Sequence, residues 1–209
     1  MLEDFIESDA SFAGLKSLSI TDCPTSLGRG GGCAARCDLL PNLEELHLND
    51  LRNLNSISEL AGHRGLRFHS LRLIKVYYCQ RMKYLLSCGD FIQTLPNLEE
   101  IKVFDCENLE KLFNNESGQN ISPDPMVPKL RILQLGNLHE FKTLCRHKET
   151  WPCLEQVEVC ECKGLRRLPL TNQNVGTIKE IKGESEWWDA LEWDDDQTKT
   201  SLLPFFHPR

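Results

Sequence analysis

Residues 95–112 read LPNLEEIKVFDCENLEKL, and this stretch decides the fold. Its apolar residues stand at Leu98, Ile101 and Val103 and are followed by Cys106, which gives the frame L-x2-(L/I/V)-x-(L/I/V)-x2-(C/L). A chain that contains one such unit has to be searched for further copies first, because an overlooked repeat leads to the wrong fold.

Six segments share this frame, in which the first leucine is position 0 and the other fixed residues stand at positions 3, 5 and 8. Their first leucines lie about 24 to 32 residues apart, a spacing typical of repeat proteins. Every copy is aliphatic at positions 0, 3 and 5, which a chain with 40% hydrophobic residues does not produce by chance. The copies are Leu15-Leu18-Ile20-Cys23, Leu43-Leu46-Leu48-Leu51, Leu71-Ile74-Val76-Cys79, Leu98-Ile101-Val103-Cys106, Leu130-Leu133-Leu135-Leu138 and Leu154-Val157-Val159-Cys162, with a partial seventh at Ile178 and Ile181.

Prolines repeat in the same frame. Four copies carry one two residues before the first leucine, at Pro41, Pro96, Pro128 and Pro152. Because proline has a fixed φ and no N–H group, we expect these residues to start strands.

A helical repeat is the competing interpretation of this spacing. Apolar residues continue at positions 11 and 14 in all copies but the first. Positions 0, 3, 8, 11 and 14 would share one face of a helix, but position 5 would fall about 140° away and is nevertheless apolar in every copy. Position 5 is Ile or Val in most copies, as strands prefer, and the repeats are shorter than the roughly 33 residues of most helix pairs. The sequence therefore favours short strands.

The strand interpretation predicts where each side chain points. Positions 3 and 5 face inward and stack from turn to turn, whereas positions 2, 4 and 6 face outward. A cysteine at position 8 can pack as a hydrophobe and still bond a backbone group, so Cys23, Cys79, Cys106 and Cys162 are interpreted as structural. We expect an α/β fold: a right-handed solenoid with a concave parallel sheet of about seven short strands and an irregular convex side of loops and short helical turns.

Charge and composition exclude several classes of protein. With 24 Lys+Arg against 31 Asp+Glu the formal net charge is -7, which gives no attraction to nucleic acid or anionic lipid. No uncharged apolar stretch approaches the roughly 20 residues of a membrane span. Residues 1–14 are acidic, whereas a secretory signal needs basic residues and an apolar run. We therefore expect a cytoplasmic protein whose ten cysteines are mostly thiols or metal ligands rather than disulfides.

The frame is that of leucine-rich repeats, and several stretches resemble one family closely. Residues 40–54 read LPNLEELHLNDLRNL, residues 162–169 read CKGLRRLP, and residues 181–184 read IKGE ahead of three tryptophans. These stretches resemble the carboxy-terminal part of plant coiled-coil, nucleotide-binding, leucine-rich-repeat disease resistance proteins. The resemblance implies a horseshoe-shaped module that senses a pathogen effector or a modified host protein. It also implies a contribution to autoinhibition, with the receptor's own nucleotide-binding domain as a second partner.

The phosphate-binding loop of that family, G-x4-G-K-(S/T), does not occur in this sequence. The glycine cluster Gly28-Arg29-Gly30-Gly31-Gly32 is not followed by Lys-Ser or Lys-Thr and is interpreted as a flexible loop. We expect no cofactor, because the nucleotide-binding module is absent from this chain. The chain is then either a fragment of a longer receptor or the product of a truncated gene.

The ends of a repeat array need polar caps, because a terminal turn has a neighbour on one side only. Residues 1–14 offer thin cover, residues 15–182 hold the repeats, and residues 183–209 form an acidic, tryptophan-rich tail. The side chains expected to cover the last turn are Trp187, Trp188, Leu191 and Trp193. The acidic run Asp194–Asp196 is interpreted as solvated rather than as a cation site.

Cysteine and histidine give weak signals for chemistry. Cys160-x-Cys162 does not have the C-x2-4-C spacing of structural zinc sites, and Cys162 already has a core role. Cys33-x3-Cys37 lies in the glycine loop and has no second cysteine pair nearby in the sequence. None of the six histidines stands in a nucleophile motif. We therefore expect no metal site, no catalytic residue and no enzymatic activity. The other cysteines outside the frame are Cys88, Cys145 and Cys153.

The outward strand positions carry the positive evidence for function. Parallel strands place residues of equal position about 4.8 Å apart, so Tyr77 lies beside Phe104 and Lys75 beside Lys102. Aromatic and aliphatic anchors mixed with charges are typical of binding surfaces. The same side chains could instead contact another domain of the receptor, or nothing. The candidate protein-binding residues are His47, Leu73, Lys75, Tyr77, Glu100, Lys102, Phe104 and Ile132.

Recognition of a protein is therefore the first functional hypothesis. The alternative from another class is a leucine-rich-repeat adaptor, such as a substrate-selecting subunit of a ubiquitin ligase, which would carry an F-box-like helical segment that this chain lacks. A third class, an enzyme or metal protein, would have to hold zinc.

Overall fold

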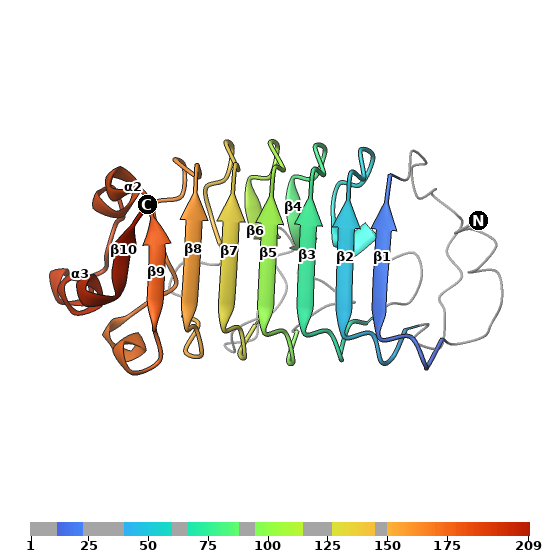
Figure 1. Ribbon diagram of the computed structural model, residues 1–209, viewed down its shortest axis with the longest axis horizontal. Coiled ribbons are helices and arrows are strands. Elements are labelled where there is room, and N and C mark those ends of the chain that lie inside the picture. Colours follow the sequence, from blue (N-terminus) through green and yellow to red (C-terminus); the bar gives the residue numbers. More distant parts are fainter. Residues whose placement is uncertain (1–11, 23–39, 60–66, 88–94, 115–126, 145–149) are drawn as a thin grey trace.

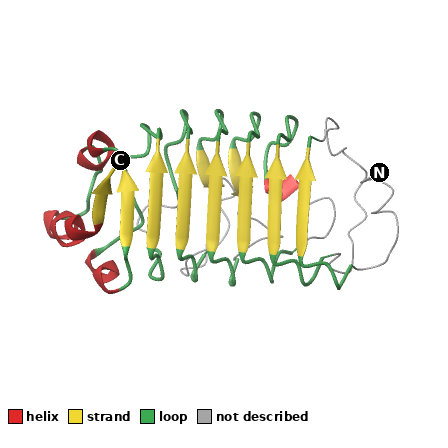
Figure 2. Ribbon diagram, viewed as in Figure 1, coloured by secondary structure: helices red, strands yellow, loops and turns green. Residues whose placement is uncertain are grey.

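The repeats fold into a solenoid with two layers, which the computed structural model describes for residues 12–22, 40–59, 67–87, 95–114, 127–144 and 150–209. One layer is an eight-stranded parallel sheet, and the other consists of loops, a helical turn at residues 57–59 and a two-stranded sheet (Figure 1, Figure 2). The large sheet runs in the order β1 (Ser17–Thr21), β2 (Glu45–Asn49), β3 (Leu73–Tyr77), β5 (Glu100–Phe104), β7 (Ile132–Gly136), β8 (Gln156–Cys160), β9 (Glu180–Gly183) and β10 (Phe206–Pro208). The small sheet pairs β4 (Tyr84–Ser87) with β6 (Lys111–Asn114).

The strands of the large sheet align at equal positions of the repeat. Ile101 of β5 is in register with Ile74 of β3 and Leu133 of β7. From β2 to β8, positions 3 and 5 are buried, while positions 2 and 4 are half-buried or exposed. This confirms the strand interpretation, and the helical repeat is wrong.

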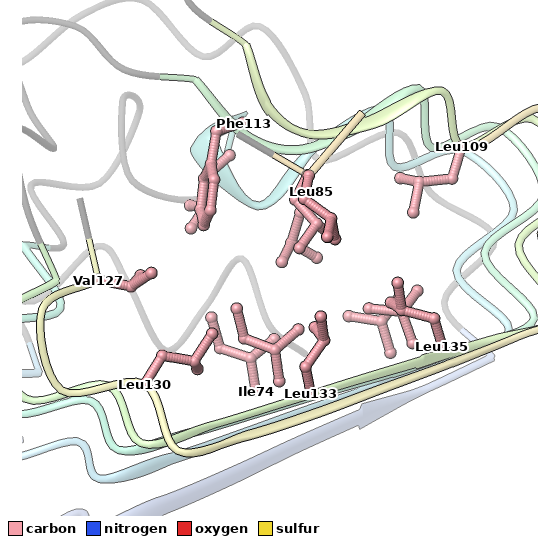
Figure 3. Packing of buried hydrophobic residues seen from close by; sticks show 14 of the residues in the cluster. Ile74, Leu85, Leu109, Phe113, Val127, Leu130, Leu133 and Leu135 are labelled. Atoms are coloured by element: carbon pink, nitrogen blue, oxygen red, sulfur yellow. The ribbon is translucent and has the colours of Figure 1, made fainter. Parts of the chain in front are cut away.

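The buried core lies between the two layers. In Figure 3, Ile74, Leu133 and Leu135 of the large sheet face Leu85 and Phe113 of the opposite layer, and these side chains are almost completely removed from water. Each turn buries its apolar side chains against its neighbours, and this burial, at about 25 cal/mol per Å² of apolar surface, holds the turns together.

The cysteines at position 8 have the structural role that the sequence predicts. The Sγ atoms of Cys106 and Cys162 each lie 3.3 Å from the backbone oxygen two residues earlier, and that of Cys79 lies 3.5 Å from its equivalent. All three are buried, and burial raises the pKa of the Cys162 thiol to about 12. Cys23 lies outside the described residues.

A β-turn precedes each strand. The N–H group of Leu98 donates to the oxygen of Leu95 at 3.2 Å, and the equivalent bond occurs before the other five repeat strands. Pro96 is therefore the second residue of its turn, where a fixed φ near −65° is favoured. The strand itself begins at Glu100, so the expectation that these prolines start strands is corrected: they shape the preceding turn.

A left-handed residue follows each of the six complete repeat strands, at position 7. Its backbone N–H group donates to the next turn, as from Asp105 to the oxygen of Gly136 at 3.0 Å. In the last complete repeat, the carboxylate of Glu184 takes the place of that oxygen and accepts from the Glu161 N–H group at 2.9 Å. The left-handed residues at position 7 are Asp22, Asp50, Tyr78, Asp105, Asn137 and Glu161, with φ between 46° and 56°.

The tail after β9 turns back onto the end of the solenoid. It contains α2 (Ser185–Asp189), α3 (Asp196–Leu202), a 3-10 turn (Leu203–Phe205) and β10, and another 3-10 turn (Asn172–Gly176) precedes β9. The Trp187 indole N–H group donates to the Leu165 oxygen at 3.1 Å, and the Trp188 ring stacks on Phe206 with centroids 4.5 Å apart. Trp187, Trp188 and Leu191 are buried against the last turn.

Two elements were not predicted. The strand β10 adds to the edge of β9 and makes eight strands where about seven were expected. The strands β4 and β6 form an ordered ribbon on the side where loops and short helical turns were expected. The strand β10 lies outside the repeated frame, whereas β4 and β6 occupy the same positions of two consecutive repeats.

Candidate protein-interaction surface

The outward positions 2, 4 and 6 form the open face of the large sheet, whose strands lie in front of β4 and β6 in Figure 1. All eight candidate residues lie on this face, from β2 to β7, and all are half-buried. The register arranges them in three rows: Leu73, Glu100 and Ile132 at position 2; His47, Lys75 and Lys102 at position 4; Tyr77 and Phe104 at position 6.

Two aromatic rings form the centre of this surface. Tyr77 and Phe104 stack with ring centroids 5.5 Å apart and an interplanar angle of 7°. The Phe104 ring also extends over Gly136 of the next strand, because an ideal Cβ at that glycine would lie only 2.5 Å from the ring. The absence of a side chain at Gly136 therefore allows two aromatic residues to cover three strands.

The lysines of the open face differ in their pairing. Lys102 Nζ lies 3.0 Å from Glu100 Oε2, and Lys182 Nζ lies 2.9 Å from Glu180 Oε1. Lys75 lies between His47 and Lys102 in its row, and within the described ranges it has no ion pair. Its charge is therefore available to an external carboxylate.

The remaining candidates frame the aromatic pair. Leu73 and Ile132 lie on either side of Glu100 in the position 2 row, so two aliphatic side chains flank one carboxylate. His47 Nε2 lies 3.4 Å from Glu45 Oε2 on the same strand. The structure thus brings all the sequence-predicted residues onto one continuous surface.

Tyr78 belongs beside this surface and was not among the candidates. It follows Tyr77, its side chain is 51% exposed, and its φ is 56°. The outward alternation of a strand does not include position 7, which is why a search of positions 2, 4 and 6 misses it.

Position 1 carries a second regularity that the sequence search did not use. The residues there alternate in sign along the edge of the sheet: Lys16, Glu44, Arg72, Glu99, Arg131, Glu155 and Lys179. Neighbours pair at 2.9 Å for Lys16–Glu44, 3.1 Å for Arg72–Glu99, 2.7 Å for Arg131–Glu155 and 2.6 Å for Lys179–Glu155. Hydrogen bonds from Arg131 and Lys179 lower the pKa of Glu155 to about 2. We call this row the charge ladder.

No group of three metal-ligating side chains occurs in the part of the chain that the structure describes. Cys162 is in the core, while Cys160 lies on the open face and Cys153 is exposed. Cys33, Cys37, Cys88 and Cys145 lie outside the described residues, so the zinc alternative is untested there.

The stacked parallel strands, the inward aliphatic triplets and the buried position 8 define the chain as a leucine-rich-repeat protein. A family model for "Plant disease resistance protein RPS2-like, leucine-rich repeats" matches residues 89–174. In Arabidopsis thaliana, the Disease resistance protein At4g27190 is 39% identical over the whole chain, and the Probable disease resistance protein At4g27220 is 41% identical over 86% of it. The Disease resistance protein SUMM2 of the same plant is 30% identical over 74%.

The chain is thus a leucine-rich-repeat segment of the plant disease resistance family, as the resemblance implied. It spans about a fifth of the length of these relatives: 21% of the first, 20% of the second and 17% of the third. The helices within the described residues are all too short or too polar to cross a membrane.

Proposed function

We propose that the open face is the recognition surface of a cytoplasmic plant immune receptor. It contacts a pathogen effector or a modified host protein, and in the resting receptor it contributes to autoinhibition by contact with the nucleotide-binding domain. The module carries no catalysis of its own. The observation that supports this most is the stacked Tyr77–Phe104 pair beside Lys75, which forms no ion pair with the described part of the chain.

Physical reasoning favours binding over simple exposure. Aromatic rings contribute large contact areas and a flat shape at low entropic cost, and they are enriched among the residues that dominate binding energy. A charge next to such an anchor adds orientation and speeds association more than it adds affinity. Both features occur together at the centre of the open face.

A leaf cell-death assay with the full-length receptor tests the proposal. One variant combines Lys75→Glu with Lys102→Glu, and a second combines Tyr77→Ala with Phe104→Ala. The control is Lys142→Glu, an exposed lysine outside the large sheet. We expect both variants to lose the response to the eliciting pathogen or to respond without it, while the control behaves as wild type. Wild-type behaviour of both variants, at equal protein level, would contradict the proposal.

A further inference from the structure

Tyr78 has a backbone conformation that does not suit its side chain. It occupies the left-handed position 7, where four of the other five repeats have Asp or Asn. A large L-residue is disfavoured there, whereas Asp and Asn are tolerated because their short polar side chains bond locally. The turn therefore does not need a tyrosine.

Packing does not account for Tyr78 either. Half of its side chain is exposed, and its bond to the next turn comes from its backbone N–H group, which donates to the Phe104 oxygen at 3.2 Å. Any residue except proline supplies that bond. Strained residues that the fold does not require are characteristic of functional sites.

The position of Tyr78 joins it to the proposed recognition surface. It directly follows Tyr77, the last residue of β3, and it is exposed at the edge of the sheet. Its neighbours along that edge, Asp50 and Asp105, are acidic and repel a carboxylate. A partner's carboxylate is therefore favoured at Lys75, about 7 Å further along the strand from Tyr77.

We infer that Tyr78 is a partner-contact residue and that the surface of Lys75, Tyr77, Phe104 and Tyr78 docks a protein segment in which a carboxylate lies close to a large apolar side chain. The carboxylate pairs with Lys75, and the apolar side chain packs against the three rings. This inference rests on the proposed recognition function and adds to it a contact residue and the chemistry of the partner.

The first test separates a binding role from a packing role. In Tyr78→Asn the left-handed turn gains a better-suited residue, so the melting temperature of the whole chain should stay the same or rise. Glu161→Asn is the matched control, since Glu161 occupies the same left-handed position in a repeat that does not contribute to the proposed docking surface. A fall of more than about 4 °C for Tyr78→Asn alone would show that the tyrosine serves packing and would overturn the inference.

The second test identifies the partner chemistry. A display library of random twelve-residue peptides is selected on the immobilised chain, and the most enriched peptide is synthesised for affinity measurement. We expect enriched peptides to contain Asp or Glu within four residues of a large apolar residue. Tyr78→Asn should weaken the affinity of the chain for the synthetic peptide about fivefold or more, and Glu161→Asn should weaken it less than about twofold.

The outcomes distinguish this inference from the proposed function. One possible result is a peptide that binds the Tyr77→Ala, Phe104→Ala variant more weakly but binds Tyr78→Asn like wild type. This result would support the open face as the binding site and would overturn the role of Tyr78. A peptide that binds both variants like wild type would contradict both proposals. Enriched peptides without acidic residues would overturn the assigned partner chemistry.

Discussion

At the scale of single residues, the close approach of backbones in neighbouring turns affects stability as much as side-chain packing does. An ideal Cβ at Gly164 would lie 2.5 Å from the backbone oxygen of Phe141 in the preceding turn. At Gly136 the obstacle is the Phe104 side chain, which can rotate, whereas the backbone oxygen of Phe141 cannot move unless the surrounding backbone shifts. Gly164 is therefore a position where glycine is required by contact between neighbouring turns.

We predict that Gly164→Ala destabilises the chain by about 1–3 kcal/mol, the usual cost of overpacking a tight site. Gly176→Ala is the control, because nothing lies within 4 Å of an ideal Cβ there. Urea denaturation at pH 7 measures both. Equal urea midpoints for the two variants would mean that the turns at Gly164 can move apart without a loss in the free energy of unfolding.

At the scale of elements, the charge ladder ties neighbouring turns together at the edge of the sheet. Each inner member faces an opposite charge on both sides, as Glu155 does between Arg131 and Lys179. Like charges in neighbouring turns would repel, so the alternation favours the native pairing of repeats over a shifted one. Single exposed pairs contribute little, but at Glu155 two cations meet one carboxylate, so the largest effect of the ladder is expected there.

The ladder predicts a specific loss of stability in acid. The pKa of Glu155 is about 2 in the folded chain against an ordinary 4.5, so its contribution is complete above about pH 5 and is lost as the pH falls toward 2. Glu155→Gln should therefore lower the urea midpoint at pH 7 and have a much smaller effect at pH 2.5. Glu140→Gln, at an exposed glutamate outside the ladder, should leave the midpoint unchanged at both values. A deficit for Glu155→Gln that is independent of pH would contradict this assignment.

At the scale of the whole molecule, a solenoid is stabilised by contacts between neighbouring turns, so its ends are its weak points. The tail supplies the last turn with a neighbour: the Trp187 ring lies against Gly183 of β9, and β10 pairs with the edge that β9 would otherwise expose. An unpaired strand edge would invite association with other chains. The tail therefore acts as a cap in both respects.

Removal of the cap contact should destabilise the carboxy-terminal strands of the solenoid and leave the stability of the central strands unchanged. We expect Trp187→Ala, which truncates a buried aromatic side chain at a cost of about 3–5 kcal/mol, to speed amide hydrogen exchange in β8, β9 and β10. Exchange in β3 and β5 should stay at the wild-type rate. Leu203→Ala, at a side chain that is 54% exposed, is the control. A uniform increase along the sheet would show that the chain unfolds as one unit.

Several of the features that the search missed were visible in the sequence. Every turn before a strand starts with an apolar residue three places before position 0, and all but the first are buried: Phe12, Leu40, Phe68, Leu95, Val127 and Trp151. The alternating charges at position 1 are equally readable. Other features were not readable: β10 follows no repeat, and although β4 and β6 begin at the same position of their repeats, their consecutive apolar residues do not alternate as in a half-buried strand.

Periodicity along the chain is sufficient to predict the solenoid, the inward triplets, the buried cysteines and the rows of the open face, because all of these follow from strands of equal register. Contacts that depend on distance and angle required the tertiary structure: the Tyr77–Phe104 stack over Gly136, the carboxylate of Glu184 in place of a strand oxygen, and the return of β10 to β9. The physical reason is that a repeat specifies which positions become neighbours, whereas ring orientation, ion pairing and the path of an aperiodic tail depend on the packing of turns that are distant in sequence.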